Sequence, residues 1–179
     1  METYQTGDTL FYPKLGPVRL VSREIRETER GCIHFTTWRG VDDPNGITHS
    51  IPSDNVDRVL RPLATKEEIA EVFQILQEDG GKPSSLNYTA RIKYQREKLN
   101  TGNYLDMAEL VRDLELRRGL ARPKGLTDNE KRNLQHALRV LSLEVSVVMG
   151  ISVAHAERQI IAAVDALREK ARAKDEAAA

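Results

Sequence analysis

The chain lacks the features on which several large classes of protein depend. It has one cysteine, Cys32, among 179 residues, which excludes an intramolecular disulfide and a cysteine-rich zinc site. Its 27 basic and 27 acidic residues cancel, so any nucleic acid would have to be held by a local basic surface. No stretch approaches about 18 uncharged apolar residues, and no basic flank with an apolar run opens the chain. We therefore expect a cytoplasmic protein without a membrane segment.

Catalytic and metal-binding motifs are also missing from the sequence. The four histidines are scattered, with no partner at the spacing of metal ligands. There is no glycine-rich phosphate loop, no GxSxG elbow and no HExxH motif. We expect a protein that is not an enzyme and that uses no metal and no cofactor.

The first sixty residues have the pattern of short strands. Four segments are bounded by turns, and the turns recur every 8–12 residues or so, which is typical of a small antiparallel barrel. The third segment alternates, with Phe35 and Thr37 on one face and Thr36 and Trp38 on the other. The fourth is expected to stop at Pro52. The segments are GDTLFYP, VRLVSREIRE, CIHFTTWRG and ITHSIPSDNV.

From Thr65 onward the apolar period is helical. Capping boxes at Thr65 with Glu68 and at Thr127 with Glu130 predict two helix starts. Asn103 and Ser152 are candidate caps of two more helices, and a fifth runs through SLNYTARIKYQREKL. Glycines at 80, 81, 119 and 150 are the predicted exits. The alanine-rich tail from about residue 173 has little to bury and is expected to fray.

These patterns predict an α+β fold in two domains. Residues 1–62 would form a small antiparallel β barrel, and residues 63–179 an all-helical domain of five helices. Apart from the second helix, each predicted helix has an apolar stripe that is expected to face the helical core. The four stripes are Ile69, Val72, Phe73 and Leu76; Met107, Leu110, Val111 and Leu114; Leu134, Leu138, Leu141, Val145 and Val148; and Ile160, Val164 and Leu167.

Basic residues collect in the helical half, in two clusters. Such a face can bind phosphates, although an ordinary solvated helix face has the same composition. Tyr88 has two interpretations as well: it continues a core stripe with Ile92 and Leu99, or it projects from the first helical turn. The clusters are Lys82, Arg91, Lys93, Arg96 and Lys98, and then Arg117, Arg118, Arg122, Lys124, Lys131 and Arg132.

Six segments, taken in order, resemble the CarD family of bacterial transcription regulators. They are GDTLFYP, IPSDNV, EIAEVFQIL, NYTARIKYQREKL, MAELVRDL and GLTDNEKR, and the resemblance extends to about Leu167. It implies a Tudor-like barrel that docks on the RNA polymerase β subunit. It also implies a helical domain that contacts promoter DNA at the upstream edge of the melted bubble and stabilises the open complex. One-to-one docking of this kind fits a monomer.

The resemblance assigns roles to particular residues. The family's wedge is a Trp at the head of its second helix, and Tyr88 stands at the matching position. The implied DNA-binding residues are Asn87, Tyr88, Arg91, Lys93, Lys131 and Arg132. The implied polymerase-binding residues are Arg26, His49, Ser50, Ile51 and Pro52.

The polymerase side departs from the family pattern at one place. Family members commonly have an Arg immediately before the Val-Pro of the fourth strand, and here Ser50 precedes Ile51-Pro52. We therefore expect rewired docking contacts that use His49, Arg39 or the backbone edge of a strand.

Two other functions compete with a DNA wedge. The protein could be a polymerase-bound scaffold whose helices only add a protein surface. Alternatively, the barrel could read a methylated ligand through an aromatic cage formed by Tyr4, Tyr12, Phe35 or Trp38.

Overall fold

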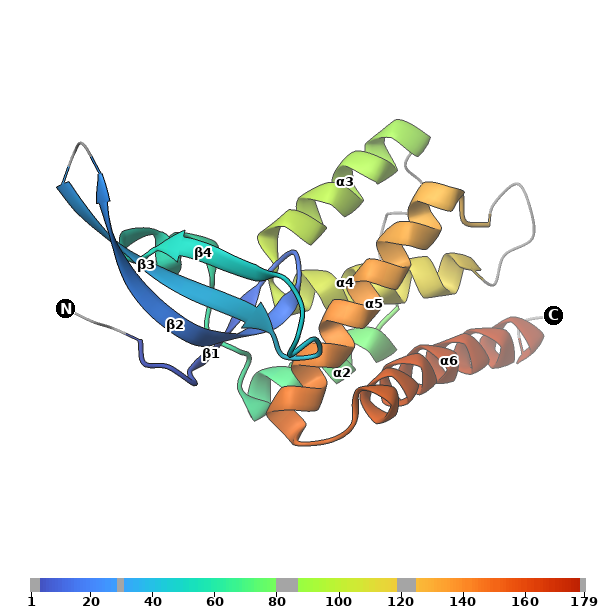
Figure 1. The fold of residues 1–179 in the computed structure, drawn as a ribbon. Coiled ribbons are helices and arrows are strands. Elements are labelled where there is room, and N and C mark those ends of the chain that lie inside the picture. Colours follow the sequence, from blue (N-terminus) through green and yellow to red (C-terminus); the bar gives the residue numbers. More distant parts are fainter. Residues whose placement is uncertain (1–3, 29–30, 80–86, 119–124, 178–179) are drawn as a thin grey trace. The chain divides into compact units, whose positions relative to one another are not determined.

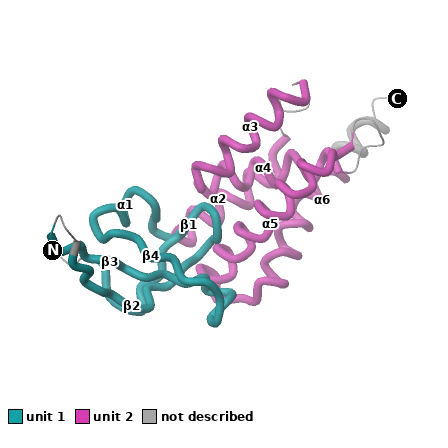
Figure 2. Tube along the Cα trace, turned by 45° about the horizontal axis from the view of Figure 1, so that its top comes forward, with its two compact units in different colours: residues 1–63 teal, residues 64–179 magenta. Residues whose placement is uncertain are grey.

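The computed structural model describes residues 4–28, 31–79, 87–118 and 125–177 (Figure 1). The chain divides into two compact units, residues 1–63 and residues 64–179 (Figure 2). The first contains a sheet and the second contains helices, which confirms the α+β class. Several residues named from the sequence lie outside the described ranges, namely Gly80, Gly81, Lys82, Gly119, Arg122 and Lys124.

Four antiparallel strands form the sheet of the first unit, in chain order. They are β1 (Thr9–Tyr12), β2 (Gly16–Thr28), β3 (Gly31–Gly40) and β4 (Thr48–Pro52). A 3-10 turn, η1 (Ser53–Asn55), and a short helix, α1 (Val56–Val59), follow β4, which ends at Pro52 as predicted. On the free side of β1, Phe11 and Arg61 exchange backbone hydrogen bonds of 2.7 and 3.0 Å. Among the described residues, this single bridge is what extends the four-stranded sheet beyond β1 in the direction of a barrel.

The sheet buries one face and exposes the other. Thr36 and Trp38 point inward and are 4% and 0% exposed, as the alternation predicts. β2 and β3 are longer than their neighbours, because β1 pairs only with residues 16–19 and β4 only with residues 35–39. Residues 23–28 and 31–34 consequently extend as a two-stranded ribbon past the rest of the sheet (Figure 1).

The described residues of the second unit form five helices, as predicted. They are α2 (Lys66–Gln77), α3 (Tyr88–Thr101), α4 (Tyr104–Arg118), α5 (Asp128–Met149) and α6 (Val153–Ala177). Both predicted capping boxes are present, at Thr65 and at Thr127. The Ser152 hydroxyl accepts from the His155 N–H at the start of α6. The α6 backbone is helical to Ala177, beyond the point near 173 where the composition predicts fraying. Lys, Arg, Glu and Ala are strong helix formers, which explains the extension.

The core of this unit lies between α2, α4, α5 and α6. The predicted stripes face it, except that Leu167 is buried without belonging to this cluster. Each fully buried Leu or Ile contributes roughly 1.5–3 kcal/mol. Gly150 closes α5 in the left-handed conformation, with φ of 66°. Within the described part of the chain, no single helix has the length and composition of a membrane span. α5 and α6 reach that threshold only as a pair bent by 114°.

Candidate nucleic-acid interface

α3 and α5 run parallel, and their N-terminal ends lie side by side (Figure 1). Hydrogen bonds at three levels set this alignment, and the middle one joins Arg91 to Glu130. The Asn129 amide donates to the Tyr88 hydroxyl at 3.0 Å. The Asn133 amide donates to Gln95 at 2.8 Å, further along both helices. Two positive helix ends, capped by Asn87 and Thr127, therefore meet at one edge of the helical unit.

Glu130 is the centre of the contact between the two helices. Its carboxylate is fully buried and accepts from Arg91 Nε at 3.0 Å and from Gln95 Nε2 at 3.3 Å. The other oxygen accepts from the backbone N–H and the hydroxyl of Thr127. Burial alone would raise the pKa of Glu130, but the hydrogen bonds from Thr127 and Arg91 outweigh it and lower the pKa. The group remains ionised and holds α3 against α5.

Tyr88 projects from the first turn of α3. Its side chain is 45% exposed, so it does not belong to the buried stripe that the period alone allowed. Arg91 lies over one face of the ring, with its guanidinium carbon 6.0 Å from the centroid. The hydroxyl accepts a hydrogen bond from the Asn129 amide.

Two of the predicted DNA-binding residues have structural roles in α3. Asn87 is the N-cap of α3, and its side chain accepts from the Ala90 N–H at 2.9 Å. Arg91 is 12% exposed and forms the ion pair with Glu130. Both residues therefore fix the first turn of α3 below Tyr88.

Three other predicted contacts are exposed cations. Lys131 and Arg132 belong to the first turns of α5, where Lys131 pairs with Asp128 at 3.0 Å and Arg132 donates to Asn129 at 3.0 Å. Lys93 is 78% exposed, with Glu97 3.9 Å away. At about 100° per residue, Lys93 lies about 140° around α3 from Tyr88. Lys131 and Arg132, at the end of α5 that contacts Tyr88, are thus better placed than Lys93 to bind DNA together with Tyr88.

Part of the basic composition is used inside the protein. Lys98 is largely buried, with Asp106 at 2.8 Å and Glu109 also bonded to it. Burial would lower the pKa of Lys98, but the hydrogen bonds to these carboxylates raise it instead. Arg117 lies 3.7 Å from Glu130. The surface available to phosphates is therefore smaller than the sequence suggests.

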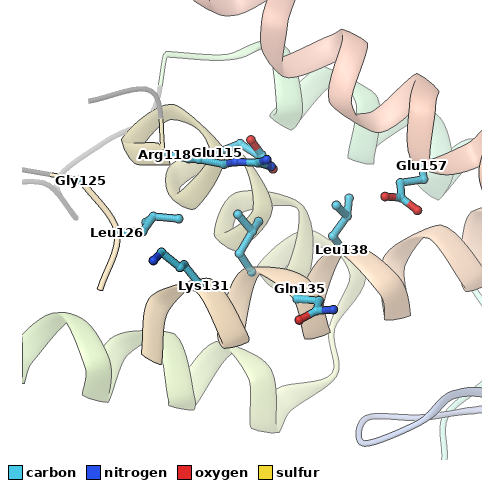
Figure 3. A pocket seen from close by; sticks show the side chains of 9 residues that line it. Glu115, Arg118, Gly125, Leu126, Lys131, Gln135, Leu138 and Glu157 are labelled. Atoms are coloured by element: carbon cyan, nitrogen blue, oxygen red, sulfur yellow. The ribbon is translucent and has the colours of Figure 1, made fainter. Parts of the chain in front are cut away.

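A groove of about 600 Å³ lies along the flank of α5, next to Lys131 (Figure 3). Its floor is apolar and its rim carries charges of both signs. Lys131 therefore borders both the groove and the N-terminal end of α5. The lining residues are Glu115, Arg118, Gly125, Leu126, Lys131, Leu134, Gln135, Leu138 and Glu157.

The predicted polymerase-binding residues divide between the faces of the sheet. Arg26 and Ser50 lie on the outer face, where the Arg26 guanidinium carbon is 4.5 Å from the Phe35 centroid. Ser50 Oγ lies 3.1 Å from the Thr37 hydroxyl. Pro52 shares this face, because it pairs with Phe35.

The other two residues of that set point inward. Ile51 is 8% exposed, and the His49 ring packs edge-on against Tyr12 at 5.8 Å. Both belong to β4, which pairs with β3 alone among the described strands. The second edge of β4 carries backbone groups that an added strand could pair with.

The four aromatics considered for a ligand cage do not surround one space. Trp38 is fully buried, and the Tyr4 ring packs edge-on against it at 6.0 Å. Phe35 is on the outer face, under Arg26, and Tyr12 contacts His49. Among the described residues, no group of three or more His, Cys, Asp or Glu is placed to hold a metal ion.

Comparison with known proteins identifies the family of this chain. The family model described as CarD, C-terminal domain, matches residues 71–161. The chain belongs to the CarD family. It is also 29% identical over 160 residues to the protein named "Putative transcription factor YdeB" of Bacillus subtilis (strain 168), covering 88% of this chain and 97% of that one. This is a family of transcription factors rather than of enzymes, and transcription regulation is its function.

The most informative residues of this CarD-family helical unit were not among the sequence candidates. The burial of Glu130 has a signal in the sequence, because the residue precedes Leu134, Ala137 and Leu141 on the buried stripe of α5. The capping box accounts for a Glu at this position without predicting an ion pair. The contact of Asn129 with Tyr88 has no signal in the sequence, since the two residues are 41 positions apart. Only the alignment of α3 with α5 identifies it.

Proposed function

We propose that this CarD-family protein stabilises the promoter open complex. In this proposal the sheet unit docks on the RNA polymerase β subunit. The helical unit then places Tyr88 as a wedge in the minor groove at the upstream edge of the transcription bubble. The protein works as a monomer, without cofactor or catalytic step.

The observation that carries the proposal is the setting of Tyr88. A half-exposed aromatic ring stands at the joined N-terminal ends of two helices and is held by Asn129 and Arg91. An apolar or aromatic side chain inserted between base steps opposes restacking of the duplex. A ring fixed in this way loses little conformational freedom when a base stacks on it.

Phosphates would be attracted by the same end of the helical unit. Lys131 and Arg132 are exposed there, and the N-termini of α3 and α5 add partial positive charge. Few cations are needed if the protein is already bound to polymerase, because tethering raises the effective DNA concentration to about the millimolar range. A chain with no net charge is suited to such a tethered role and would bind free DNA weakly.

The expected energy is modest but sufficient. Stacking of one base on an aromatic side chain contributes ~1–3 kcal/mol, which is roughly a five- to 150-fold shift in an opening equilibrium. Because Tyr offers less area than Trp, we expect a value near the lower limit.

Docking on polymerase is supported by the free edge of β4 and by the outer face of the sheet. An extended segment of a partner can add a strand at such an edge, with backbone hydrogen bonds supplying affinity. Arg26 and Ser50 flank that surface and would supply side-chain contacts. Ser50 lacks the charge of the family's Arg, so the backbone share of the contact is expected to be larger here.

A polymerase-bound interaction protein without a DNA wedge is the second candidate. It is favoured by the internal use of Arg91, Lys98 and Arg117, which reduces the basic surface. A pull-down that recovers polymerase, together with no crosslink from the helical unit to upstream DNA, would select it.

The decisive experiment is the lifetime of the open complex on a purified promoter. We expect the wild-type protein to lengthen it and Tyr88→Ala to return it toward the value without protein, while binding to the β subunit is unchanged. Lys66→Ala is the matched control: it removes an exposed cation from α2, whose first turn contacts α4 through Glu68 and Tyr104. Equal lifetimes with wild type and Tyr88→Ala would exclude the wedge.

A further inference from the structure

Three side chains at the tip of the helical unit form one line of hydrogen bonds. Arg132 Nη2 donates to Asn129 Oδ1 at 3.0 Å. Asn129 Nδ2 donates to the Tyr88 hydroxyl, also at 3.0 Å. All three residues are exposed, and the line ends on the aromatic ring proposed as the wedge.

The donor chemistry fixes the direction of this relay. A guanidinium has only donors, so the Asn129 atom that it meets must be the amide oxygen. The atom that faces Tyr88 is then the amide nitrogen, which can only donate. The phenol oxygen is thus the acceptor of this bond, and its own O–H hydrogen remains to be donated elsewhere. A bond received by the oxygen also strengthens the O–H as a donor, because linked hydrogen bonds polarise one another.

We propose that the Tyr88 hydroxyl donates a hydrogen bond to a minor-groove acceptor of the DNA, with Asn129 and Arg132 as the residues that orient it. The proposal rests on the wedge function above and adds a polar contact to it. The acceptor is a pyrimidine O2 or a purine N3, the atoms that base pairs present in the minor groove.

The orienting bond from Asn129 depends on the residue that this chain has at the wedge position. An indole N–H can donate but cannot accept, so a Trp there would leave the Asn129 amide without its acceptor. The phenol does both, since it accepts from the protein on one side and donates to DNA on the other. The relay therefore offsets part of the stacking area that is lost when Tyr stands in place of Trp.

The test combines a protein variant with a DNA variant in the open-complex lifetime assay, using cognate polymerase. Tyr88→Phe keeps the ring and removes the hydroxyl, and we expect a lifetime about two- to tenfold shorter, the size of one net hydrogen bond. In the DNA, each pyrimidine at the upstream edge is replaced in turn by an analogue without the O2 acceptor (difluorotoluene for thymine), and each purine by its 3-deaza analogue. These analogues keep the shape of the base and lack the minor-groove acceptor. At one position the difference between wild type and Tyr88→Phe should disappear.

A second variant reverses the relay without removing the hydroxyl. In Asn129→Asp the carboxylate accepts from both Arg132 and the phenol, which turns the O–H inward. We expect the same loss as in Tyr88→Phe, and no further loss in the double variant. A further loss in the double variant would mean that the added charge acts directly on the DNA, and it would overturn the orienting role of Asn129.

The outcomes separate this proposal from the one on which it rests. If Tyr88→Ala shortens the lifetime and Tyr88→Phe does not, the wedge stands and the hydroxyl contact is excluded. If Tyr88→Phe remains weaker than wild type on every analogue, the hydroxyl does not contact a base. If the wild-type protein itself leaves the lifetime unchanged, both proposals fail.

Discussion

Arg91 and Glu130 form an ion pair inside the helical unit, with Nε 3.0 Å from Oε1 and the carboxylate fully buried. The pair lies one turn along α3 from Tyr88 and joins α3 to the first turn of α5. We infer that Arg91 positions the wedge rather than binding phosphate itself. A variant of Arg91 with weak promoter binding would then report a displaced helix and not a lost DNA contact.

The first prediction concerns Glu130→Gln. At pH 7 we expect a loss of about 3 kcal/mol in the free energy of unfolding, because a buried ion pair loses the charge of one member. The pKa of Glu130 is lowered by folding, so its contribution is complete above the ordinary value of 4.5 and is lost as the pH falls through the folded value. The difference between the two proteins should therefore shrink below about pH 4.5. Urea unfolding at pH 7 and at lower pH measures it.

Asp128→Asn is the matched control for that measurement. Asp128 is two residues earlier, is 85% exposed and pairs with Lys131 at the surface. Its replacement should change the unfolding free energy by at most about 0.5 kcal/mol. Equal losses in the two variants would show that Glu130 acts through the charge of the helix end rather than through its buried ion pair.

Lys131→Gln should weaken promoter association and make it less sensitive to salt. A cation that neutralises one phosphate contributes about 0.9 to the slope of log K against log salt concentration. We expect the slope to fall by about that amount for Lys131→Gln and to remain unchanged for Lys66→Gln. Lys93→Gln, on the far side of α3 from Tyr88, should have a smaller effect. Binding of the polymerase–protein complex to promoter DNA at several KCl concentrations provides the comparison, and a larger effect at Lys93 would move the interface to the other face of α3.

Much of this fold could be predicted from the sequence, because local signals specify it. The capping boxes at Thr65 and Thr127 and the apolar stripes of α2, α4, α5 and α6 depend only on neighbours a few residues apart. The charged residues could not be assigned in this way. Arg91 and Lys93 look alike in the sequence, and only the approach of α5 makes Arg91 internal and leaves Lys93 exposed.

Arg26→Ala should weaken binding to the isolated β subunit by about 1–2 kcal/mol, which is roughly five- to thirtyfold. The Arg26 side chain is half exposed, stacks on Phe35 and pairs with Glu24, so its guanidinium lies on the outer face of the sheet. Arg58→Ala removes an exposed cation from α1 in the same unit and should have little effect. Surface plasmon resonance with the purified subunit measures both. Equal affinities of Arg26→Ala and wild type would leave the edge of β4 as the principal docking contact.

Tyr88→Trp separates ring area from the hydroxyl. The indole offers a larger stacking surface and cannot accept the Asn129 hydrogen bond. We expect this variant to keep at least half of the wild-type effect on open-complex lifetime, because the stacking gain and the lost hydrogen bond are each about 1 kcal/mol. Its indole N–H can still donate to the minor-groove acceptor, so a response to the acceptor-free base analogue is expected for both proteins. An effect below half that of the wild-type protein would show that the hydrogen bond from Asn129 contributes more than the added ring area.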